Sequence, residues 1–519
     1  MPVPLDMLGI SVADLYASYR NMYWPNGQKI IAASKHVART DGLYAVYISN
    51  FRCGPDSFIW HYVTEELKGK PFLHLEVDEH SADAGMVTRI EAFLDSLEGS
   101  EKNARKAVEV IRPRPSPSEP PSNRTLYFPY MHDGARFVAA AARSVGIPSE
   151  VLPMQTEEDI ALGRKYTSSK ECFPMICTTG SFLKKLMEPG ADPSKMSFFM
   201  PDHNGPCRFG QYNQFQRILF DRLGFRDAEL VTPSNDTSYA DLAGDRSQRF
   251  RINAWKGFVA FDFIRKLYRE TRPYELNPGD SEAVYLDAMK KAEASIEKNC
   301  RGLRRILVGA ASAFMAVKVD KSKKKPVIAV LGEIFMRDNA GCNGNIANRL
   351  EALGAEVLIG PFSEWITYST HRYTRDSRWK NDTKGVIRSK IQGIGQEVLV
   401  DYLLRGIRKV SDTSKDVSLH EILRLSNRYV SEFYDGDPPI ALGMSSALAG
   451  RGVSGIAAIL PFTCMPGTLI ASVSDSFRKD HNNIPFLNIP YDGQDSVSLE
   501  TRLQAFFFQV REYAEAHQQ

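Results

Sequence analysis

Strands and helices are predicted to alternate along most of the chain. Short apolar runs suited to buried strands are followed by stretches in which apolar residues recur every three or four positions, as in amphipathic helices. This order is typical of parallel sheets covered by helices, and it predicts an α/β fold with several Rossmann- or flavodoxin-like domains. Two strand–helix–strand units are predicted. The first comprises Thr125–Pro129, Asp133–Val145 and Glu150–Leu152, and the second comprises Val327–Leu331, Asn345–Leu353 and Glu356–Ile359.

Two changes in this pattern divide the chain into domains. Arg112–Asn123 has five prolines in twelve residues, which disfavours a helix or an inner strand and predicts an extended linker. From about Asn253 to Val317 the apolar spacing is helical, and the lysine-rich Lys321–Pro326 is predicted to be a solvated connection. The predicted segments are an N-terminal α/β piece (1–111), the linker (112–123), an α/β domain (124–250), an inserted helical region (251–325) and a C-terminal α/β domain (326–519).

Composition narrows the functional classes. The 519 residues include 65 Lys and Arg and 62 Asp and Glu, and the formal net charge of +3 argues against nucleic acid as a partner. The start of the sequence lacks the features of a secretory signal, and the most apolar stretch, Leu307–Val317, is about half the length of a membrane span. We therefore expect a cytoplasmic protein without a membrane segment. With that location, seven cysteines favour thiol or metal chemistry over disulfides.

Four cysteines share one kind of position. Cys53, Cys172, Cys207 and Cys464 each come shortly before a predicted helix, three of them follow a predicted strand, and each has a proline within two residues. The carboxyl ends of strands are where open α/β sheets bind ligands. The positive end of a helix dipole is expected to lower the pKa of a thiol there and to favour an anionic cluster. Thiolates are also the ligands that select iron–sulfur clusters or zinc.

Other interpretations of the cysteines remain open. Cys300 and Cys342 do not meet the positional criterion, and Cys177 has no adjacent proline. Cysteines also occupy protein interiors simply as small apolar residues. Four thiolates would suit a structural zinc site, although such sites usually use closely spaced ligand pairs. Cys207 with His203 four residues earlier could form a nucleophilic pair.

The segments around these cysteines carry a family resemblance. They read NFRCGPDSFIWH, YTSSKECFPMICTTG, MPDHNGPCRFGQYNQFQR and PFTCMPGTLIASV, with NIPYDGQDS after the last. In these segments the chain resembles the iron–sulfur component of the 2-hydroxyacyl-CoA dehydratase and benzoyl-CoA reductase superfamily. It is most similar to the carboxy-terminal part of the long activase-related proteins, known as CoA-substrate-specific enzyme activases. The resemblance extends from about residue 20 to the end.

The resemblance implies an electron-driven reaction on an acyl-CoA. In the superfamily, a separate ATP-dependent activase with its own iron–sulfur cluster supplies one low-potential electron, and hydroxide leaves from the resulting ketyl radical of the 2-hydroxyacyl-CoA. This chain would act as, or within, such a dehydratase-type lyase or reductase, in an oligomer and under anaerobic conditions. No Gly-rich phosphate loop opens the chain, so ATP hydrolysis is assigned to the activase. The alternative is a non-catalytic iron–sulfur electron carrier or scaffold subunit.

The resemblance also implies site residues. Related sequences often have a second cysteine where this chain has Met175, which leaves open whether Cys177 takes part. Catalytic residues are not identified. Side chains that flank Cys207 are expected to donate hydrogen bonds to a cluster or a substrate. The implied ligands of a [4Fe-4S] or double-cubane cluster are Cys53, Cys172, Cys207 and Cys464, and the flanking residues are Arg208, Gln211 and Tyr212.

Two further polar segments allow a functional and a structural interpretation. Asp78–Asp83 (DEHSAD) could bind a metal ion, but Ser81 and Asp83 are better suited to cap the following helix. Thr370–Lys384 has five Lys or Arg, two Asp and two aromatic residues, and could hold the phosphates and adenine of coenzyme A. A solvated loop or a subunit contact is the alternative for this second segment.

Overall fold

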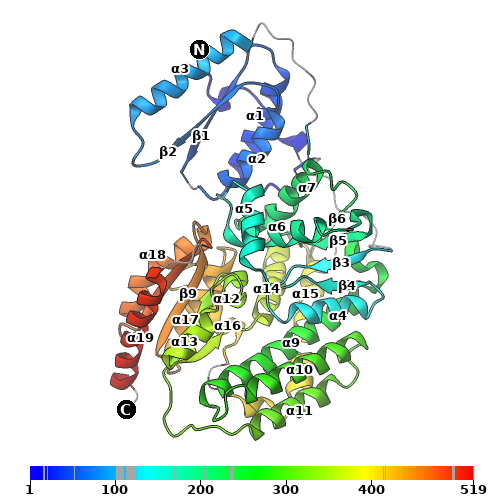
Figure 1. Ribbon diagram of the computed structural model, residues 1–519, viewed down its shortest axis with the longest axis vertical. Helices are drawn as coiled ribbons and strands as arrows, with labels where there is room; N and C mark the ends of the chain where they lie inside the picture. Colours follow the sequence, from blue (N-terminus) through cyan, green and yellow to red (C-terminus); the bar gives the residue numbers. More distant parts are fainter. Residues whose placement is uncertain are drawn as a thin grey trace.

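The computed structural model describes the chain except for residues 16–17, 20, 52, 101–109, 113–122, 169, 204, 234–238, 413, 415, 494–496 and 518–519. Three sheets are present, and every ladder between their described strands is parallel. Helices cover the sheets, and a helical bundle lies at the end of the molecule opposite the N-terminal unit (Figure 1). The fold is therefore α/β with several Rossmann- or flavodoxin-like units, as the alternating pattern predicts.

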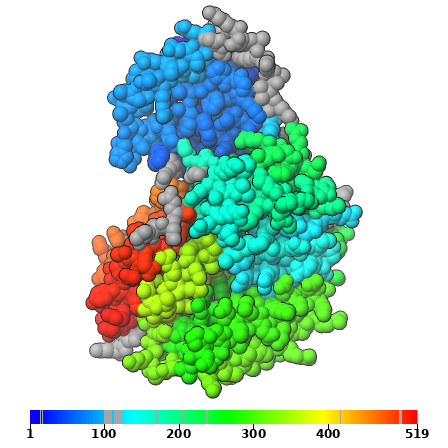
Figure 2. All heavy atoms as spheres, in the orientation of Figure 1, coloured from blue at the N-terminus to red at the C-terminus, as the bar shows by residue number. Residues whose placement is uncertain are grey.

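The N-terminal unit contains a two-stranded sheet. Its core is continuous with that of the central domain, since Phe58 and Tyr62 belong to the same buried cluster as Tyr212 and Phe215. Figure 2 shows this unit, in blue, resting on the cyan and green central domain. Most of the predicted linker, residues 113–122, lies outside the described residues. The elements are α1 (Pro25–Arg39), β1 (Ala45–Asn50), α2 (Asp56–Glu66), β2 (Phe72–Val77) and α3 (Asp83–Ser100).

The central domain is built on a four-stranded parallel sheet. Its strand order is β4-β3-β5-β6. The chain places β4 on one side of β3 and then β5 and β6 on the other, so the order in which the parallel strands are added reverses between β3 and β5. In open α/β sheets, the crevice at the carboxyl ends of the strands on either side of such a reversal is the usual ligand site. The elements are β3 (Thr125–Phe128), α4 (Ala135–Arg143), β4 (Ser149–Val151), α5 (Glu157–Tyr166), α6 (Phe173–Leu186), β5 (Met196–Phe199), α7 (Tyr212–Arg222) and β6 (Glu229–Val231).

The C-terminal domain repeats this strand order. Its sheet is β10-β9-β7-β8, with the corresponding reversal between β7 and β9, and every residue of those two strands is buried. Continuous apolar strands are expected where helices cover both faces of a parallel sheet. The elements are β7 (Val327–Gly332), α12 (Ile334–Asp338), α13 (Ile346–Leu353), β8 (Glu356–Ile359), α14 (Ser363–Trp379), α15 (Thr383–Leu404), α16 (Leu419–Ser426), α17 (Asp437–Ala449), β9 (Gly455–Pro461), α18 (Met465–Asp480), β10 (Phe486–Tyr491) and α19 (Val497–His517).

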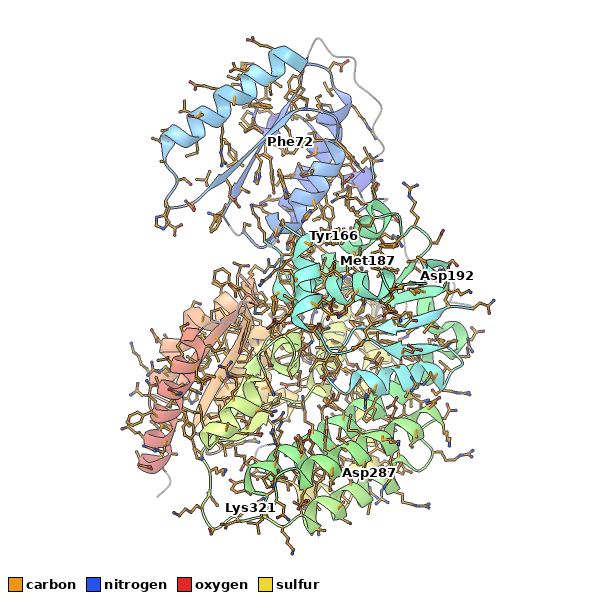
Figure 3. All side chains as sticks on the ribbon, in the orientation of Figure 1. Phe72, Tyr166, Met187, Asp192, Asp287 and Lys321 are labelled. Atoms are coloured by element: carbon orange, nitrogen blue, oxygen red, sulfur yellow. The ribbon has the colours of Figure 1, made fainter. Side chains whose placement is uncertain are left out.

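The predicted helical region is confirmed. After the short α8 (Ala240–Ala243), three long helices, α9 (Ser247–Thr271), α10 (Asp280–Glu297) and α11 (Leu303–Ala316), pack with α4 around one apolar core. The lysine-rich connection follows α11 near the bundle end of the molecule, where Figure 3 labels Lys321, and the Lys321 amine lies 5.2 Å from the Tyr274 ring centre. This connection is therefore remote from the N-terminal unit.

The interpretation of Thr370–Lys384 as a loop is wrong. Most of this segment belongs to α14, and its end begins α15, whose first turn is capped by Asp382 accepting from the Gly385 N–H at 3.0 Å. Arg372 and Arg375 each form an ion pair with Asp435 at 2.9 Å. The polar residues that suggest a loop thus lie on a helix, and two of its arginines are paired with a carboxylate. No described helix combines the length and hydrophobicity that crossing a membrane requires.

The acidic segment before α3 forms a turn. Asp78 accepts hydrogen bonds from the His80 N–H and from the Ser81 hydroxyl, both at 2.9 Å. Asp83 lies in the first turn of α3, where a carboxylate favours the positive end of the helix dipole. Ser81 therefore stabilises the turn with its hydroxyl group.

Candidate functional site

Three of the four selected cysteines stand at the same backbone position. Cys172 is the N-cap residue of α6, Cys464 that of α18, and Cys207 that of a 3-10 turn, Arg208–Gln211, which leads into α7. Cys207 follows β5 and Cys464 follows β9, the equivalent strands of the two four-stranded sheets. Both lie beyond the carboxyl end of a strand that borders the reversal of strand order. The two sheets thus place a thiol at equivalent sites.

A single buried arginine connects the segments that carry these cysteines. Arg208 is 5% exposed and reaches all three α/β units. Its guanidinium donates to the Ser57 hydroxyl of α2 at 3.4 Å and to the Lys170 carbonyl, shortly before α6, at 3.3 Å. It also donates to the Thr463 carbonyl at 2.9 Å, next to Cys464. Contacts from one side chain therefore bring residues near 55, 170, 208 and 463 together.

The charge of Arg208 has no carboxylate partner among the described residues. Its hydrogen bonds end on hydroxyl and carbonyl oxygens, which are neutral. Burial alone would lower the pKa of Arg208, but the Cys172 and Cys464 side chains nearby raise it above its ordinary value. A buried cation without a counter-ion costs several kcal/mol, roughly, of folding free energy. The site is thus suited to an anionic group.

The thiols differ in one respect from the sequence-based expectation. Burial raises the pKa of Cys172, Cys207 and Cys464, so the expected lowering by the helix dipole does not occur in the free thiols. Each thiol also influences a neighbour: Cys172 raises the pKa of Cys207, and Cys207 raises that of Cys464. These mutual effects indicate that the three thiols belong to one neighbourhood of the structure.

The residues that flank Cys207 have different roles. The Tyr212 hydroxyl is hydrogen-bonded to the Cys172 sulfur, and with Arg208 it belongs to the immediate surroundings of the thiols. The amide group of Gln211 accepts from the Tyr62 hydroxyl and donates to the Asn21 carbonyl. The contribution of Gln211 to a cluster stays a prediction.

Cys53 lies beside the same arginine. A Cβ atom added at Gly54 would meet the Arg208 side chain at 3.5 Å. Burial raises the pKa of Cys53, and the neighbouring charges that act most strongly on it belong to Asp56 and Arg208. The structure therefore brings Cys172, Cys207 and Cys464 into one group and leaves Cys53 at its edge, and the ligand roles of all four stay predictions.

The remaining cysteines occupy two other places. Cys177 of α6 and Cys342 after α12 are both buried, with their sulfur atoms 3.0 Å apart, across the boundary between the central and C-terminal domains. Cys300 lines a surface pocket of about 440 Å³ in the helical region. Within the described part of the chain, no three His, Cys, Asp or Glu side chains surround one point as the ligands of a single metal ion do.

The proposed nucleophilic pair is not assembled. The His203 ring lies against Gly205, where an added Cβ would approach its Nε2 at 2.9 Å, and near the Phe209 ring. Burial lowers the pKa of His203 to about 4, so its imidazole is neutral near pH 7. In the described residues no hydrogen bond joins it to Cys207, and the structure therefore offers no support for base-assisted attack by that thiol.

Two carboxyl groups beside the thiols, the half-buried Glu333 and the buried Asp437, escaped the sequence analysis. Glu333 follows β7 and caps α12 by accepting from the Met336 N–H at 2.8 Å, and Asp437 opens α17. Burial, together with the Asp437 carboxylate, raises the pKa of Glu333 to about 8, and burial raises that of Asp437 to about 7. Glu333 follows β7, which is next to β9 in the sheet. Glu333 and Cys464 therefore follow the two strands between which the strand order reverses. A strand end followed by a short helix is the signal that could have identified it.

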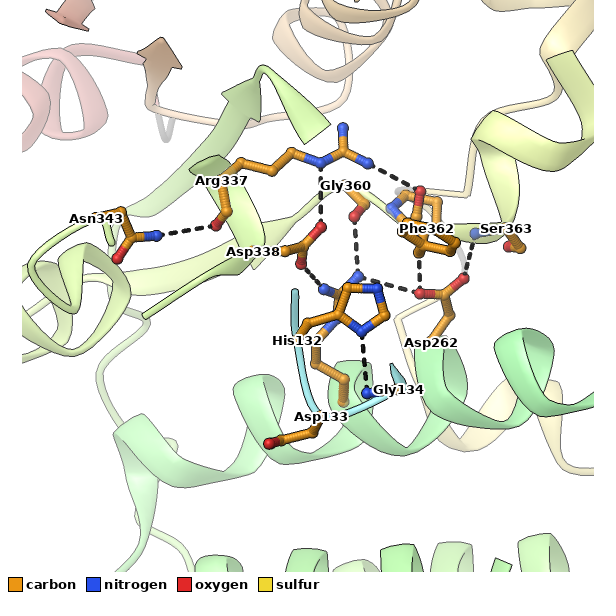
Figure 4. Close-up of polar contacts among 12 residues, drawn as sticks. His132, Asp133, Gly134, Asp262, Arg337, Asp338, Asn343, Gly360, Phe362 and Ser363 are labelled. Carbon is orange, nitrogen blue, oxygen red and sulfur yellow. Dashed lines mark hydrogen bonds and ion pairs between the residues drawn. The ribbon is translucent and has the colours of Figure 1, made fainter. Parts of the chain in front are cut away.

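A buried ion network lies between the helical region and the C-terminal domain (Figure 4). Arg265 of α9 pairs with Asp338 at the end of α12 and donates to Asp262 at 3.1 Å. Asp262 in turn accepts from the Phe362 and Ser363 N–H groups at 2.9 and 2.8 Å, which fixes the start of α14. These contacts hold α14 at the position where Glu364 enters the buried region.

We expect the stability of the protein to depend on the protonation of Glu364. This residue is 6% exposed, and neither of its oxygen atoms has a hydrogen-bond partner among the described residues. Burial raises its pKa from 4.5 to about 8. Between those values the folded protein retains a proton that the unfolded chain has lost, so the free energy of unfolding falls as the pH rises across this window.

The Glu364→Gln variant should therefore be more stable than the wild type at pH 8 by about 4 kcal/mol, and the difference should vanish near pH 4. Urea unfolding at several pH values measures both. If the free energies of unfolding of the wild type and the variant changed with pH in parallel, Glu364 would already be ionised in the folded protein.

No protein-family model matches the chain, and no curated protein matches it.

Proposed function

We propose that this chain is an iron–sulfur protein of the 2-hydroxyacyl-CoA dehydratase and benzoyl-CoA reductase superfamily. It would accept low-potential electrons from a separate ATP-dependent activase and act as, or within, a reductive acyl-CoA dehydratase or reductase. The observation that carries the proposal is the buried Arg208, a cation without a carboxylate partner among the described residues, placed beside three thiols from two domains. Beyond this chemistry, the proposal depends on the sequence resemblance.

The residues at this place fit a thiolate-bound cluster. Cys172, Cys207 and Cys464 are soft donors at helix N-termini, where a negative charge is favoured. In a cubane each thiolate binds a different iron, so the sulfur atoms surround a cluster instead of a single ion. Arg208 would offset the negative charge of the thiolates, and the Tyr212 hydroxyl would donate to the Cys172 sulfur. Cys53 remains a candidate for a fourth ligand.

When bound, the cluster would supply electron transfer at low potential, and the chain's own residues would prepare the site. Cys172 and Cys464 are buried and Cys207 is half-buried, so the chain shields most of the site from water. Glu333 and Asp437, with pKa values raised to about 8 and about 7, hold protons near neutral pH and are suited to protonate a leaving oxygen atom. Three cysteine ligands would leave one iron open to substrate, whereas a fourth ligand would close the cluster and favour the alternative, a non-catalytic electron carrier.

The first test is to count metal and sulfide in the full chain. After anaerobic purification and reconstitution with iron and sulfide, about four iron and four acid-labile sulfide per chain are expected for one cubane, and about eight iron for a double cubane. Zinc in place of iron, with no labile sulfide, would overturn the redox proposal and leave a structural site. A chain that holds no metal after reconstitution would remove the basis of both the redox proposal and the structural zinc site.

A further inference from the structure

The outward face of α15 carries a continuous apolar stripe. Ile387, Ile391, Ile394, Val398 and Tyr402 succeed one another at intervals of three or four residues, so they lie along one side of the helix. Their exposed fractions are 59%, 66%, 63%, 59% and 59%. Single exposed apolar side chains are common, but five in a row form the kind of contiguous patch that marks an interaction surface.

The opposite face of α15 fixes the helix on the molecule. The Trp255 indole of α9 donates to the Gln396 carbonyl at 3.2 Å, and Arg251 donates to the Gln392 side chain at 2.6 Å. Leu403 is 1% exposed and belongs to the core of the helical bundle. The stripe therefore projects from a helix that is held on its inner side, and its exposure does not result from a loosely attached element.

The stripe has nearly the same spacing in both directions. Ile394 stands at its centre, Ile391 and Val398 lie three and four residues to either side, and Ile387 and Tyr402 lie seven and eight residues to either side. If a second α15 ran antiparallel across the first, Ile394 would meet Ile394 of the other copy. Ile391 would then meet Val398, and Ile387 would meet Tyr402. A surface that matches itself on rotation is what a twofold interface requires.

Charges beside the stripe favour the same arrangement. Lys390, Glu397 and Asp401 are exposed, lie along one edge of the stripe, and form no ion pair among the described residues. In an antiparallel pair, Lys390 of one copy would face Glu397 and Asp401 of the other. In a parallel pair, the twofold axis runs along the helices and places this edge of the two copies on opposite sides of the contact, so Lys390 would not meet Glu397 or Asp401.

We propose that this face of α15 joins two copies of the chain into an antiparallel dimer. The stripe spans about 24 Å of helix at roughly 1.5 Å per residue. Specific interfaces bury roughly 1,000 Å² or more in total, so residues next to the stripe must contribute to the contact. A lipid surface suits the stripe less well, because Glu397 and Asp401 at its edge would face anionic headgroups. The dimer does not depend on the proposed iron–sulfur function.

Sedimentation equilibrium of the full chain tests the dimer. The wild type should have twice the 58.2 kDa mass of one chain. Ile394→Lys places like charges at the twofold axis and should raise the dissociation constant at least a hundredfold. Leu286→Lys, which changes an apolar residue of α10 that is 55% exposed, is the matched control and should leave the dimer intact. Unchanged circular dichroism in both variants would show that they fold.

A charge exchange adds a second readout. Lys390→Glu alone should weaken the dimer about tenfold, and the double variant with Glu397→Lys should restore it, which a loss of folding could not produce. A monomeric wild type would overturn the proposal, as would a dimer that survives Ile394→Lys. Binding of monomeric chain to anionic lipid vesicles that is lost in Ile394→Lys would overturn it in favour of a membrane contact.

Discussion

Replacing Cys207 or Cys464 with serine should remove at least about nine-tenths of the reconstituted iron and leave the chain folded. A serine oxygen is a much poorer ligand for iron in a cluster than a thiolate. Both cysteines are N-cap residues, and serine is among the preferred residues at that position, so neither helix start should be weakened. Iron and acid-labile sulfide per chain, measured beside the circular dichroism spectrum, separate loss of the cluster from loss of the fold.

Cys300→Ser is the matched control for this experiment. Cys300 has a positive φ of 60° and lines the pocket in the helical region, away from the Arg208 contacts. Its replacement should leave the iron content unchanged. Retention of all iron by both the Cys207 and the Cys464 variants would refute the ligand assignment. Loss of iron from the Cys300 variant would show that a neighbouring proline is the wrong criterion for choosing ligands.

Local patterns in the sequence carry much of the fold and part of the site. Alternating apolar runs predict the parallel sheets and the helical region, because both depend on spacing within short segments. The same local reasoning places Cys172, Cys207 and Cys464 at helix starts, and Cys207 and Cys464 also after a strand, because both positions are set by residues close in sequence. Arg208 and Tyr212 follow from their closeness to Cys207.

Long-range contacts explain what the sequence analysis missed. The pairing of Arg372 and Arg375 with Asp435 turns a polar stretch into a packed helix, and nothing near residue 370 indicates a partner some sixty positions away. Glu333 lies near Cys464 only because β7 and β9 are adjacent in the sheet. The direction of the thiol pKa shifts was also missed, because burial depends on the assembled domains and outweighs the helix dipole.

Removal of the Asp338 carboxylate is expected to cause the largest loss of stability among single substitutions in the ion network. The Asp338 side chain is 1% exposed and contacts the guanidinium groups of Arg265 and Arg337. Burial alone would raise the pKa of Asp338, but Arg265 and Arg337 hold it below its ordinary value, so the carboxylate stays charged. Asp338→Ala leaves two buried cations with less compensation, which typically costs about 3–5 kcal/mol.

The surface residue Asp287 provides the matched control for Asp338→Ala. Asp287 of α10, labelled at the outside of the bundle in Figure 3, pairs with Lys291 at 2.6 Å, and both side chains are about 60% exposed. Asp287→Ala should cost at most about 0.5 kcal/mol, because water screens such a pair. In urea unfolding, Asp338→Ala should lower the midpoint strongly and Asp287→Ala hardly at all. Equal midpoints for the two variants would mean that Arg265 and Arg337 need no carboxylate at position 338. The contacts of Arg265 with Asp262 and the Gly360 carbonyl would then be enough to hold α9 against the C-terminal domain.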